Sequence, residues 1–472
     1  MFLCREKELG LLNKRFRADD TECIVIYGRR RVGKTALINE FVKDKKHIYF
    51  PALKANASDN LAALSKAIQE YLTPGAVNYP VYGSFDNAFG AITGIVRQER
   101  VVFVIDELPY LCEADDSIPS RLQHLLDHDW AETGMFLILC GSSMSFMERE
   151  VLGEKSPLFG RRTAQLKIEP LHFWEAAKFN PDLSPEDKAL VYGITGGVPH
   201  YIRKLHVGNG SVQEALLDNF FDRSSYLFEE PGNLLRQELR EPGIYNSTIT
   251  AIADGHTKPS DIASRLHIET GQLNRYLKVL IELGILEKVE PVIENGRNKV
   301  FYRICDNFFR FWYRFVPGNM MAIASGNMDK IYDQAVEGYL HDYMGQTFEY
   351  MCRDYLKQHY DQLPFPISDI GEWWGSDPKL HKEIQLDIVA PEIKEHTGTG
   401  GNRYLVGSCK YRNESIGINE LLLIRQYAAV FTSAADRCTY YLFSKSGFTQ
   451  GLKDAAQGED VKLHTLDDLY RK

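Results

Sequence analysis

The stretch that decides the fold is Gly28-Arg29-Arg30-Arg31-Val32-Gly33-Lys34-Thr35, a complete G-x-x-x-x-G-K-[ST] pattern. It follows the apolar segment Cys23–Tyr27, which predicts a strand, and it opens a predicted helix over Lys34–Val42. A phosphate-binding loop needs this order of strand, loop and helix. Its glycines let the backbone curl so that successive N–H groups face an anion, and the helix N-terminus adds partial positive charge. The stretch therefore predicts a site for the phosphates of a nucleotide.

Two side chains in this loop have chemical roles of their own. Lys34 can reach the β- and γ-phosphates, and the hydroxyl of Thr35 can ligate Mg²⁺. ATP and Mg²⁺ are accordingly the expected cofactors. A chance glycine loop with a lysine is the competing interpretation, and the ordered strand–loop–helix context argues against it. The residues expected to bind the nucleotide here are Gly28, Arg29, Arg30, Arg31, Val32, Gly33, Lys34, Thr35 and Ala36.

A second signal lies 72 residues further along the chain. Val101–Ile105 is an uninterrupted apolar run, typical of a strand buried on both faces, and it ends in Asp106-Glu107. Acids at the carboxyl end of a parallel strand lie where open α/β sheets bind their ligands. We expect Asp106 to hold the Mg²⁺ shell and Glu107 to orient the attacking water, which implies hydrolysis. A capping Asp-Glu pair is the alternative, and the phosphate loop makes the catalytic interpretation the favoured one.

Two further residues are candidates for supporting roles. The apolar run Leu137–Cys140 leads into Ser142, which can sense the γ-phosphate from a neighbouring strand end or cap the next helix. Arg161 follows Gly160 and can stabilise transition-state charge, in its own chain or in a neighbouring copy. The alternative for Arg161 is an ordinary surface arginine. Both pairs of interpretations stay open at this point.

Length and composition narrow the class of protein. At 472 residues, with 44% hydrophobic residues, the chain should form about three domains. A net charge of −9 argues against broad, nonspecific affinity for nucleic acid. No apolar window has the length of a membrane span, and the charged start does not resemble a signal peptide. The eight cysteines are scattered without C-x-x-C pairs, so zinc is not indicated and a cytoplasmic protein is expected.

The order of predicted elements indicates an α/β fold with a mainly parallel sheet in the N-terminal third. An extra strand should lie between the two motif strands, because 72 residues are too many for one crossover. We predict a P-loop ATPase core at 1–168, a helical lid at 169–238, a winged helix at 239–318 and a nuclease-like domain at 319–472. The strands expected in the core are 23–27, 47–50, 101–105, 136–140 and 164–168.

The winged helix-turn-helix is predicted from three helices, at 244–253, 258–266 and 271–283, and from two strands, at 285–289 and 299–304. Asn295-Gly296 between the strands is a hairpin signal. Glu269 and Glu282 dilute the basic character of the third helix, so an internal packing module is the alternative to a DNA-binding one. The residues of this helix that could face a DNA groove are Gln272, Asn274, Arg275 and Lys278.

The C-terminal region carries the parts of a metal-dependent phosphodiester cleaver. Glu349 lies on a predicted helix, Asp387 on a predicted strand, and Lys410 follows another strand. The carboxylates would hold Mg²⁺ and the lysine would help to position water. The position two before Lys410 should be acidic but is Ser408, a poor Mg²⁺ ligand. Glu349 or Glu383 are the acids expected to compensate. An altered nuclease and an inactive scaffold both remain open.

Along nearly its whole length the chain resembles the archaeal-type P-loop ATPases of the STAND/AAA+ class that carry a C-terminal nuclease-like domain of the PD-(D/E)xK type, which has a restriction-endonuclease-like α/β fold. The segments that carry the resemblance are Phe2-Leu3-Cys4-Arg5-Glu6-Lys7-Glu8-Leu9, Tyr27–Thr35, Val104–Leu108, Gly141-Ser142-Ser143, Gly197-Val198-Pro199, Gln385-Leu386-Asp387-Ile388-Val389-Ala390 and Ser408-Cys409-Lys410.

The resemblance implies that Arg5 lies near the nucleotide, that Pro199 approaches the adenine and that the winged helix reports nucleotide state to the rest of the chain. In the C-terminal pair the family pattern reads E-I-D-L-V-A and E-C-K, and this chain has Gln385 and Ser408 in place of the two glutamates.

The expected function is a Mg²⁺-dependent ATPase that couples nucleotide state to the winged helix and the nuclease-like domain, on or near double-stranded DNA. The alternative is a nucleotide-gated signalling or interaction protein with an inactive nuclease-like scaffold, and an ATP-dependent transcription factor is a third hypothesis. A homo-oligomer or a protein partner fits any of these, because such lids often take an arginine from a neighbour. No membrane partner is expected.

Overall fold

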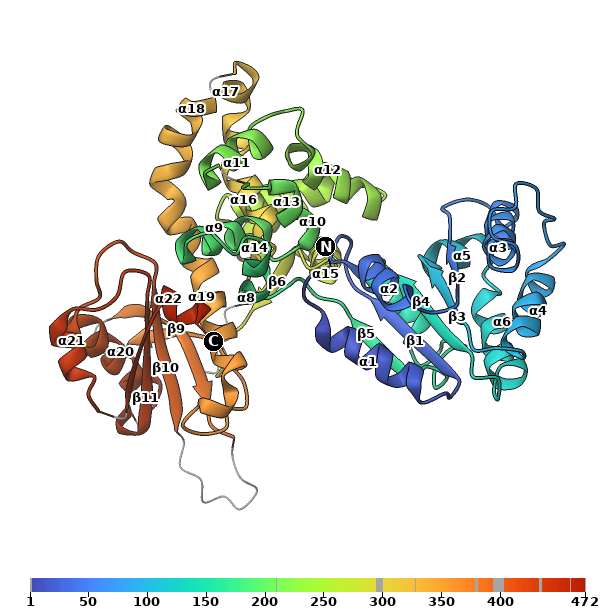
Figure 1. Ribbon diagram of the computed structural model, residues 1–472. Coiled ribbons are helices and arrows are strands. Elements are labelled where there is room, and N and C mark those ends of the chain that lie inside the picture. Colours follow the sequence, from blue (N-terminus) through green and yellow to red (C-terminus); the bar gives the residue numbers. More distant parts are fainter. Residues whose placement is uncertain are drawn as a thin grey trace. The chain divides into compact units, whose positions relative to one another are not determined.

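The computed structural model describes residues 2–208, 210–293, 300–326, 328–377, 381–393, 403–432, 435–458 and 460–471. The chain forms two compact units (Figure 1). The first is Met1–Leu171 with Val198–His200, and the second is His172–Gly197 with Tyr201–Lys472. Within the described ranges, no helix is both long and apolar enough to cross a bilayer.

The first unit alternates strands and helices as the sequence predicts. Its strands are β1 (Glu22–Tyr27), β2 (His47–Pro51), β3 (Val102–Asp106), β4 (Phe136–Gly141) and β5 (Ala164–Lys167). Its helices are α1 (Glu6–Arg17), α2 (Lys34–Val42), α3 (Ala57–Leu72), α4 (Phe85–Val96), α5 (Leu108–Ala114), α6 (Ile118–His124) and the short α7 (Met144–Phe146).

The five strands form one parallel sheet in the order β2-β3-β4-β1-β5. Strand β4 lies between β1, which precedes the phosphate loop, and β3, which carries Asp106. This confirms the expected extra strand between the two motif strands. The order also brings the carboxyl ends of β1, β3 and β4 to one edge of the sheet, where the phosphate loop, Asp106 and Ser142 follow.

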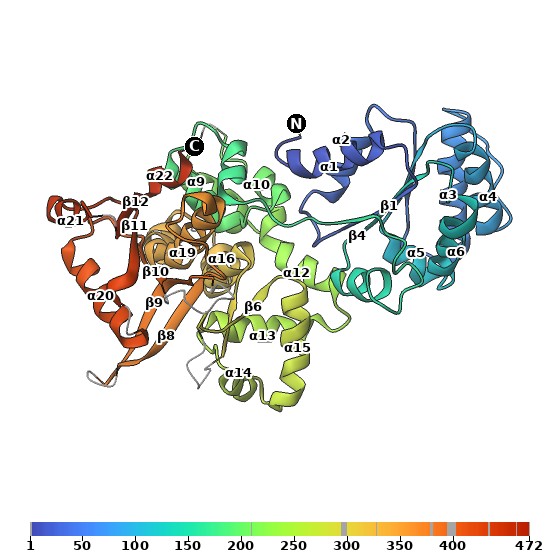
Figure 2. The ribbon, with the colours of Figure 1, turned by 90° about the horizontal axis from the view of Figure 1, so that it is seen from below.

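Two apolar cores cover the two faces of this sheet. Successive side chains of a strand point to opposite faces, so Ile24 and Ile26 pack with α1 and α2, whereas Cys23 and Val25 pack with α3, α4, α5 and α6. Figures 1 and 2 show these two groups of helices on either side of β1 and β4. Because all six residues of β1 are buried, the strand that ends in the phosphate loop is held rigidly from both sides.

The second unit begins with helices and ends in a mixed sheet. Its helices are α8 (Phe173–Ala176), α9 (Pro185–Thr195), α10 (Pro199–Leu205), α11 (Val212–Phe220), α12 (Tyr226–Glu238), α13 (Pro242–Ala253), α14 (Pro259–Leu266), α15 (Thr270–Glu282), α16 (Asn307–Phe315), α17 (Met320–Ala324), α18 (Met328–Ile331), α19 (Leu340–Gln358), α20 (Ile418–Phe431), α21 (Gln450–Ala455) and α22 (Leu466–Tyr470). Its strands are β6 (Leu286–Val289), β7 (Phe301–Ile304), β8 (Gly371–Asp377), β9 (Lys382–Pro391), β10 (Tyr404–Lys410), β11 (Cys438–Ser444) and β12 (Val461–Thr465).

The elements expected of a winged helix are present: α13, α14 and α15 contact one another, and β6 pairs antiparallel with β7. The Asn295-Gly296 turn lies outside the described residues. Further along, the mixed sheet has the order β12-β11-β10-β9-β8, in which β10, β11 and β12 are parallel and β8 and β9 are antiparallel. Helices α19 and α20 flank it (Figure 1). The assignments as winged helix and nuclease-like domain remain predictions.

A buried charge network ties the β6–β7 hairpin to the mixed sheet. The side chain of Glu372, only 1% exposed, accepts hydrogen bonds from Arg303 Nη2 on β7 at 2.6 Å and from Arg353 Nη1 on α19 at 2.9 Å. Arg303 also pairs with Glu287 of β6. A backbone hydrogen bond connects the same two regions, since Val292 N donates to the carbonyl of Glu372 at 2.9 Å. Although burial opposes it, the two arginines keep the pKa of Glu372 below its usual value.

Replacing Glu372 by alanine should destabilise the second unit by about 3–5 kcal/mol, because two largely buried guanidinium groups would lose their shared partner. Urea unfolding followed by tryptophan fluorescence measures this, since Trp373 and Trp374 adjoin the network. The control is Glu290→Ala, which breaks the half-exposed pair with Lys288 and should change stability by less than about 1 kcal/mol. Equal effects of the two variants would contradict the importance of the network.

Candidate functional site

The phosphate loop connects β1 to α2, and two glycines give it its shape. Gly28 has φ of 151°, and a Cβ there would overlap the carbonyl oxygen of Ile168, which follows β5. Gly33 has φ of 98° and is the N-cap of α2, where it brings no side chain to the first N–H groups of the helix. Those N–H groups can therefore receive an anion. Thr35 and Ala36, on the first turn of α2, are both exposed.

Lys34 crosses this loop from its C-terminal end. Its ammonium donates to the carbonyl of Gly28 at 2.8 Å and to that of Arg29 at 2.9 Å, and the residue is 6% exposed. Burial lowers the pKa of Lys34 from its usual value, while the nearby Glu107 and Asp106 oppose that shift. A buried ammonium that is held by two carbonyl oxygens in the centre of the loop is the counter-charge that a phosphate would need.

Asp106 ends β3 and meets Thr35, as the sequence predicts for a pair that shares a magnesium ion. The Thr35 hydroxyl lies 3.2 Å from Asp106 Oδ2. The same oxygen accepts from the Tyr49 hydroxyl at 2.5 Å, a contact that sequence reasoning missed because Tyr49 belongs to neither nucleotide motif. A hydroxyl and a carboxylate are ligands that suit Mg²⁺, so the residues present fit that ion.

Glu107 lies between β3 and α5 in the left-handed conformation, with φ of 57°. Its Oε2 accepts from the Ser142 hydroxyl at 2.9 Å and from the Ser142 backbone N–H at 3.2 Å. Ser142 follows β4, so its side chain links two neighbouring strand ends. The N-cap of α7 is Ser143, which makes no capping bond with its side chain. The structure thus joins Ser142 to Glu107 and not to the next helix.

The remaining residues predicted for the first unit lie in three places. The Arg5 guanidinium donates to the carbonyl of Val32 in the phosphate loop at 3.2 Å and to the carbonyl of Glu169. Arg161 pairs with both carboxylate oxygens of Asp127, at 3.1 and 3.0 Å. Pro199 begins α10, and its segment is grouped with the first unit. Arg5 thus contacts the phosphate loop, and the roles of Arg5, Arg161 and Pro199 in nucleotide binding and catalysis remain predictions.

In the second unit, Glu349, Asp387 and Lys410 line one pocket of about 430 Å³. The Lys410 ammonium lies 3.5 Å from Asp387 Oδ2 and 3.3 Å from Glu420 Oε1. Ser408 donates to the same Glu420 oxygen at 2.6 Å. Sequence reasoning missed Glu420, which lies on α20 outside the motif, while Glu383 is exposed on β9. The carboxylate nearest to the position of the missing acid thus comes from a helix.

Acidic side chains close to one another in this pocket repel each other. Burial, followed by repulsion from Asp387 and Glu372, raises the pKa of Glu349 to about 8. Gln385, at the other departure from the family pattern, lies 3.4 Å from Glu372 through its amide nitrogen. Across the ranges that the structure describes, no group of three or more His, Cys, Asp or Glu side chains is arranged to hold a metal ion.

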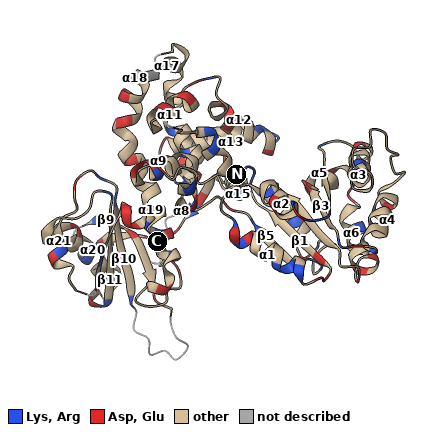
Figure 3. Ribbon diagram, in the orientation of Figure 1, with Lys and Arg blue, Asp and Glu red and all other residues tan. Residues whose placement is uncertain are grey.

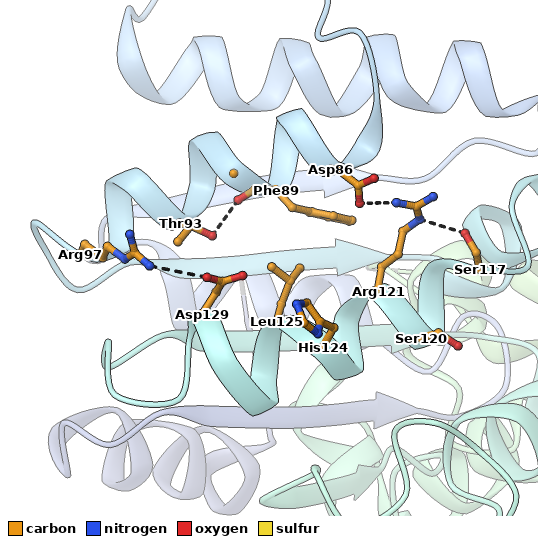
Figure 4. A pocket seen from close by; sticks show the side chains of 11 residues that line it. Asp86, Phe89, Thr93, Arg97, Ser117, Ser120, Arg121, His124, Leu125 and Asp129 are labelled. Atoms are coloured by element: carbon orange, nitrogen blue, oxygen red, sulfur yellow. Dashed lines mark hydrogen bonds and ion pairs between the residues drawn. The ribbon is translucent and has the colours of Figure 1, made fainter.

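A separate pocket of about 640 Å³ lies in the first unit between α4 and α6 (Figure 4). Ion pairs join its two sides, from Arg121 to Asp86 and from Arg97 to Asp129. Its floor includes Phe89. None of the residues predicted for nucleotide binding or catalysis lines this pocket. Its charged side chains pair with one another across it, and we assign it no function.

Two family models match the chain. Residues 2–205 match an ATPase domain that occurs predominantly in Archaea. Residues 312–421 match DUF234, a family of archaeal and bacterial proteins of unknown function. The first match covers the phosphate loop, Asp106, Glu107 and Ser142. The second covers the residues that line the pocket with Glu349, Asp387 and Lys410, and it also includes Glu420.

Individual proteins resemble the chain to different extents. The uncharacterized protein MJECL04 of Methanocaldococcus jannaschii is 31% identical over 394 residues, which are 83% of this chain and 84% of that protein. The uncharacterized ATP-binding protein MJ0423 of the same organism is 46% identical over 46 residues, 10% of this chain and 78% of that protein. The Walker-type ATPase PABY2304 of Pyrococcus abyssi has a similar structure, with a TM-score of 0.51 at 18% identity over 66% of this chain and 96% of its own. That likeness confirms the P-loop ATPase fold.

Proposed function

This chain belongs to the same family as the uncharacterized protein MJECL04 and carries an archaeal-type ATPase domain at residues 2–205, and we propose that its first unit binds ATP with Mg²⁺ and hydrolyses it. The observation that carries this proposal is the meeting of Thr35, Asp106 and Glu107 at the edge of the sheet that bears the phosphate loop. A site for binding alone needs no carboxylate beside the γ-phosphate, whereas hydrolysis needs one to orient water.

The residues divide the work of the reaction. The loop N–H groups and Lys34 bind the phosphates, and Thr35 and Asp106 would hold the ion. Mg²⁺, when bound, neutralises phosphate charge. Glu107 orients the attacking water, and Ser142 holds Glu107 from the neighbouring strand end. If Arg161 acts as an arginine finger, in its own chain or on a neighbouring copy in a homo-oligomer, it must first leave Asp127.

Changing Glu107 to glutamine should keep ATP bound and lower its turnover by roughly 100-fold or more, because an amide cannot accept a proton from water. Phosphate release and binding of a fluorescent ATP analogue measure the two effects separately. Lys34→Ala is the comparison, since loss of the phosphate counter-charge should abolish binding itself. Undiminished turnover in Glu107→Gln would show that the assignment of the water-orienting residue is wrong.

We further propose that the second unit presents a winged helix to duplex DNA. The buried face of α15, with Leu273, Leu277 and Leu280, packs inward. Its predicted DNA-facing residues, Gln272, Asn274, Arg275 and Lys278, are all exposed. Basic and acidic residues are interspersed along the helices of both units (Figure 3), so binding would depend on this local set of side chains.

Replacing Arg275 and Lys278 together by alanine should weaken duplex binding at low salt. It should also reduce the slope of log affinity against log salt by about 2, since each phosphate contact contributes about 0.9. Fluorescence anisotropy of a labelled duplex at several salt concentrations gives this slope. The matched control is Lys453→Ala with Lys462→Ala, two exposed lysines of the mixed-sheet region. An equal loss of duplex affinity in the control would show that binding does not depend on the winged helix.

A second candidate function is a nucleotide-gated interaction protein whose mixed-sheet region is an inactive nuclease-like scaffold. The arrangement around Ser408 favours the scaffold, because Lys410 already pairs with Asp387 and Glu420 and offsets part of their negative charge. A serine at the position of the missing acid also supplies no charge to attract an ion.

Supercoiled plasmid incubated with the protein and Mg²⁺ or Mn²⁺ should therefore remain intact, as agarose gels would reveal. Nicking that disappears in Asp387→Ala would overturn the scaffold assignment and restore an active nuclease. Nicking that persists in this variant would come from a contaminant.

A further inference from the structure

Tyr49 touches the ATPase site without belonging to any of its motifs. Its hydroxyl donates to Asp106 Oδ2 at 2.5 Å, and this is the oxygen that also accepts from Thr35. The other carboxylate oxygen, Oδ1, accepts from the Glu107 N–H at 3.1 Å. Asp106 is therefore held at both oxygens, and Tyr49 supplies the shortest of these contacts.

The sheet explains how Tyr49 reaches this position. Strand β2 pairs in parallel with β3, so that Tyr49 lies opposite Val104 and Pro51 lies opposite Asp106. Tyr49 packs into the core on the α1 and α2 face of the sheet, and its long side chain extends to the carboxyl end of the neighbouring strand. An ionised carboxylate can only accept hydrogen bonds, so the Tyr49 phenol is the donor in this contact.

We propose that Tyr49 is a positioning residue of the ATPase site, whose phenol orients the Asp106 carboxylate so that Asp106 and Thr35 together accept a divalent cation. This inference rests on the proposed ATPase function. Partners that hold a metal ligand from outside the coordination sphere set its orientation, and their loss typically costs about 10–100-fold in metal affinity or activity. Tyr49 contacts the two residues that would hold the ion, Asp106 and Thr35, so its effect should fall on binding of the ion.

The test compares Tyr49→Phe with the unaltered protein in two measurements. The first is the affinity for a fluorescent ATP analogue in EDTA, which should not change. The second is the Mg²⁺ concentration that gives half-maximal ATPase rate, which should rise by about 10-fold or more. The matched control is Tyr71→Phe, because Tyr71 donates to the Glu99 carboxylate from α3 in the same unit. This control should leave both measurements unchanged.

A double-mutant cycle separates positioning from a general effect on folding. The readout is the ratio of analogue affinities with and without Mg²⁺, which needs no turnover. Tyr49→Phe should lower this ratio when Asp106 is present. It should have no further effect in the Asp106→Asn variant, because Tyr49 acts through Asp106. An unchanged ratio, an equal loss in both backgrounds, or a loss of affinity in EDTA would each overturn the proposal.

The outcomes also distinguish this inference from the function on which it rests. A protein that shows no Mg²⁺-dependent hydrolysis before any substitution would contradict the proposed ATPase. Normal hydrolysis with an unaltered Mg²⁺ requirement in Tyr49→Phe would contradict the role of Tyr49 alone. If Tyr49→Phe is too unstable to purify, Tyr49→Leu also removes the hydroxyl and should likewise raise the Mg²⁺ requirement by about 10-fold. An unaltered Mg²⁺ requirement in Tyr49→Leu would overturn the proposal.

Discussion

The carboxyl ends of parallel strands share one edge of a sheet, and the chemistry of the first unit depends on this constraint. The phosphate loop follows β1, Asp106 ends β3 and Ser142 follows β4. The hydrogen bond from Thr35 to Asp106 joins residues 71 positions apart, and the bond from Ser142 to Glu107 joins residues 35 positions apart. Both are short in space because β4 pairs with β3 on one side and with β1 on the other, so the ends of all three strands lie close together at one edge of the sheet. Any change that shifts the register of β4 would therefore move Ser142 away from Glu107.

The second unit is organised around a different constraint, the cost of burying charge. Glu372 can remain ionised in its buried position because Arg303 and Arg353 reach it from two different elements. An ion pair of this kind adds little net stability compared with apolar packing, but it strongly penalises separation of its members. The β6–β7 hairpin and the mixed sheet should consequently move as one body. A winged helix that responds to nucleotide state would then carry the mixed-sheet region with it.

The sequence predicts the motif-bearing elements well because their signals are local. Strand β1, helix α2 and the Asp106-Glu107 turn are specified by apolar runs, glycines and acids within a few residues of one another. Tyr49 and Glu420 have no such signal, because each contributes one side chain from an element that the motif does not include. The pairing of β2 with β3 shows that Tyr49 belongs to the first site. The contacts of Ser408 and Lys410 with Glu420 on α20 show the same for Glu420 and the second site. Such long-range contacts follow from the tertiary fold and cannot be found from spacing.

Asp106 and Glu107 are adjacent in sequence and chemically alike, yet their surroundings assign them different tasks. Asp106 lies within the strand and is fixed by Tyr49, Thr35 and a backbone N–H, so its carboxylate has little freedom to turn. Glu107 has left the strand in a left-handed conformation and is held through one oxygen by Ser142. A metal ligand benefits from a fixed orientation, whereas a residue that orients water has to exchange hydrogen-bond partners during the reaction. The number of protein partners on each carboxylate thus matches the role that each would have in hydrolysis.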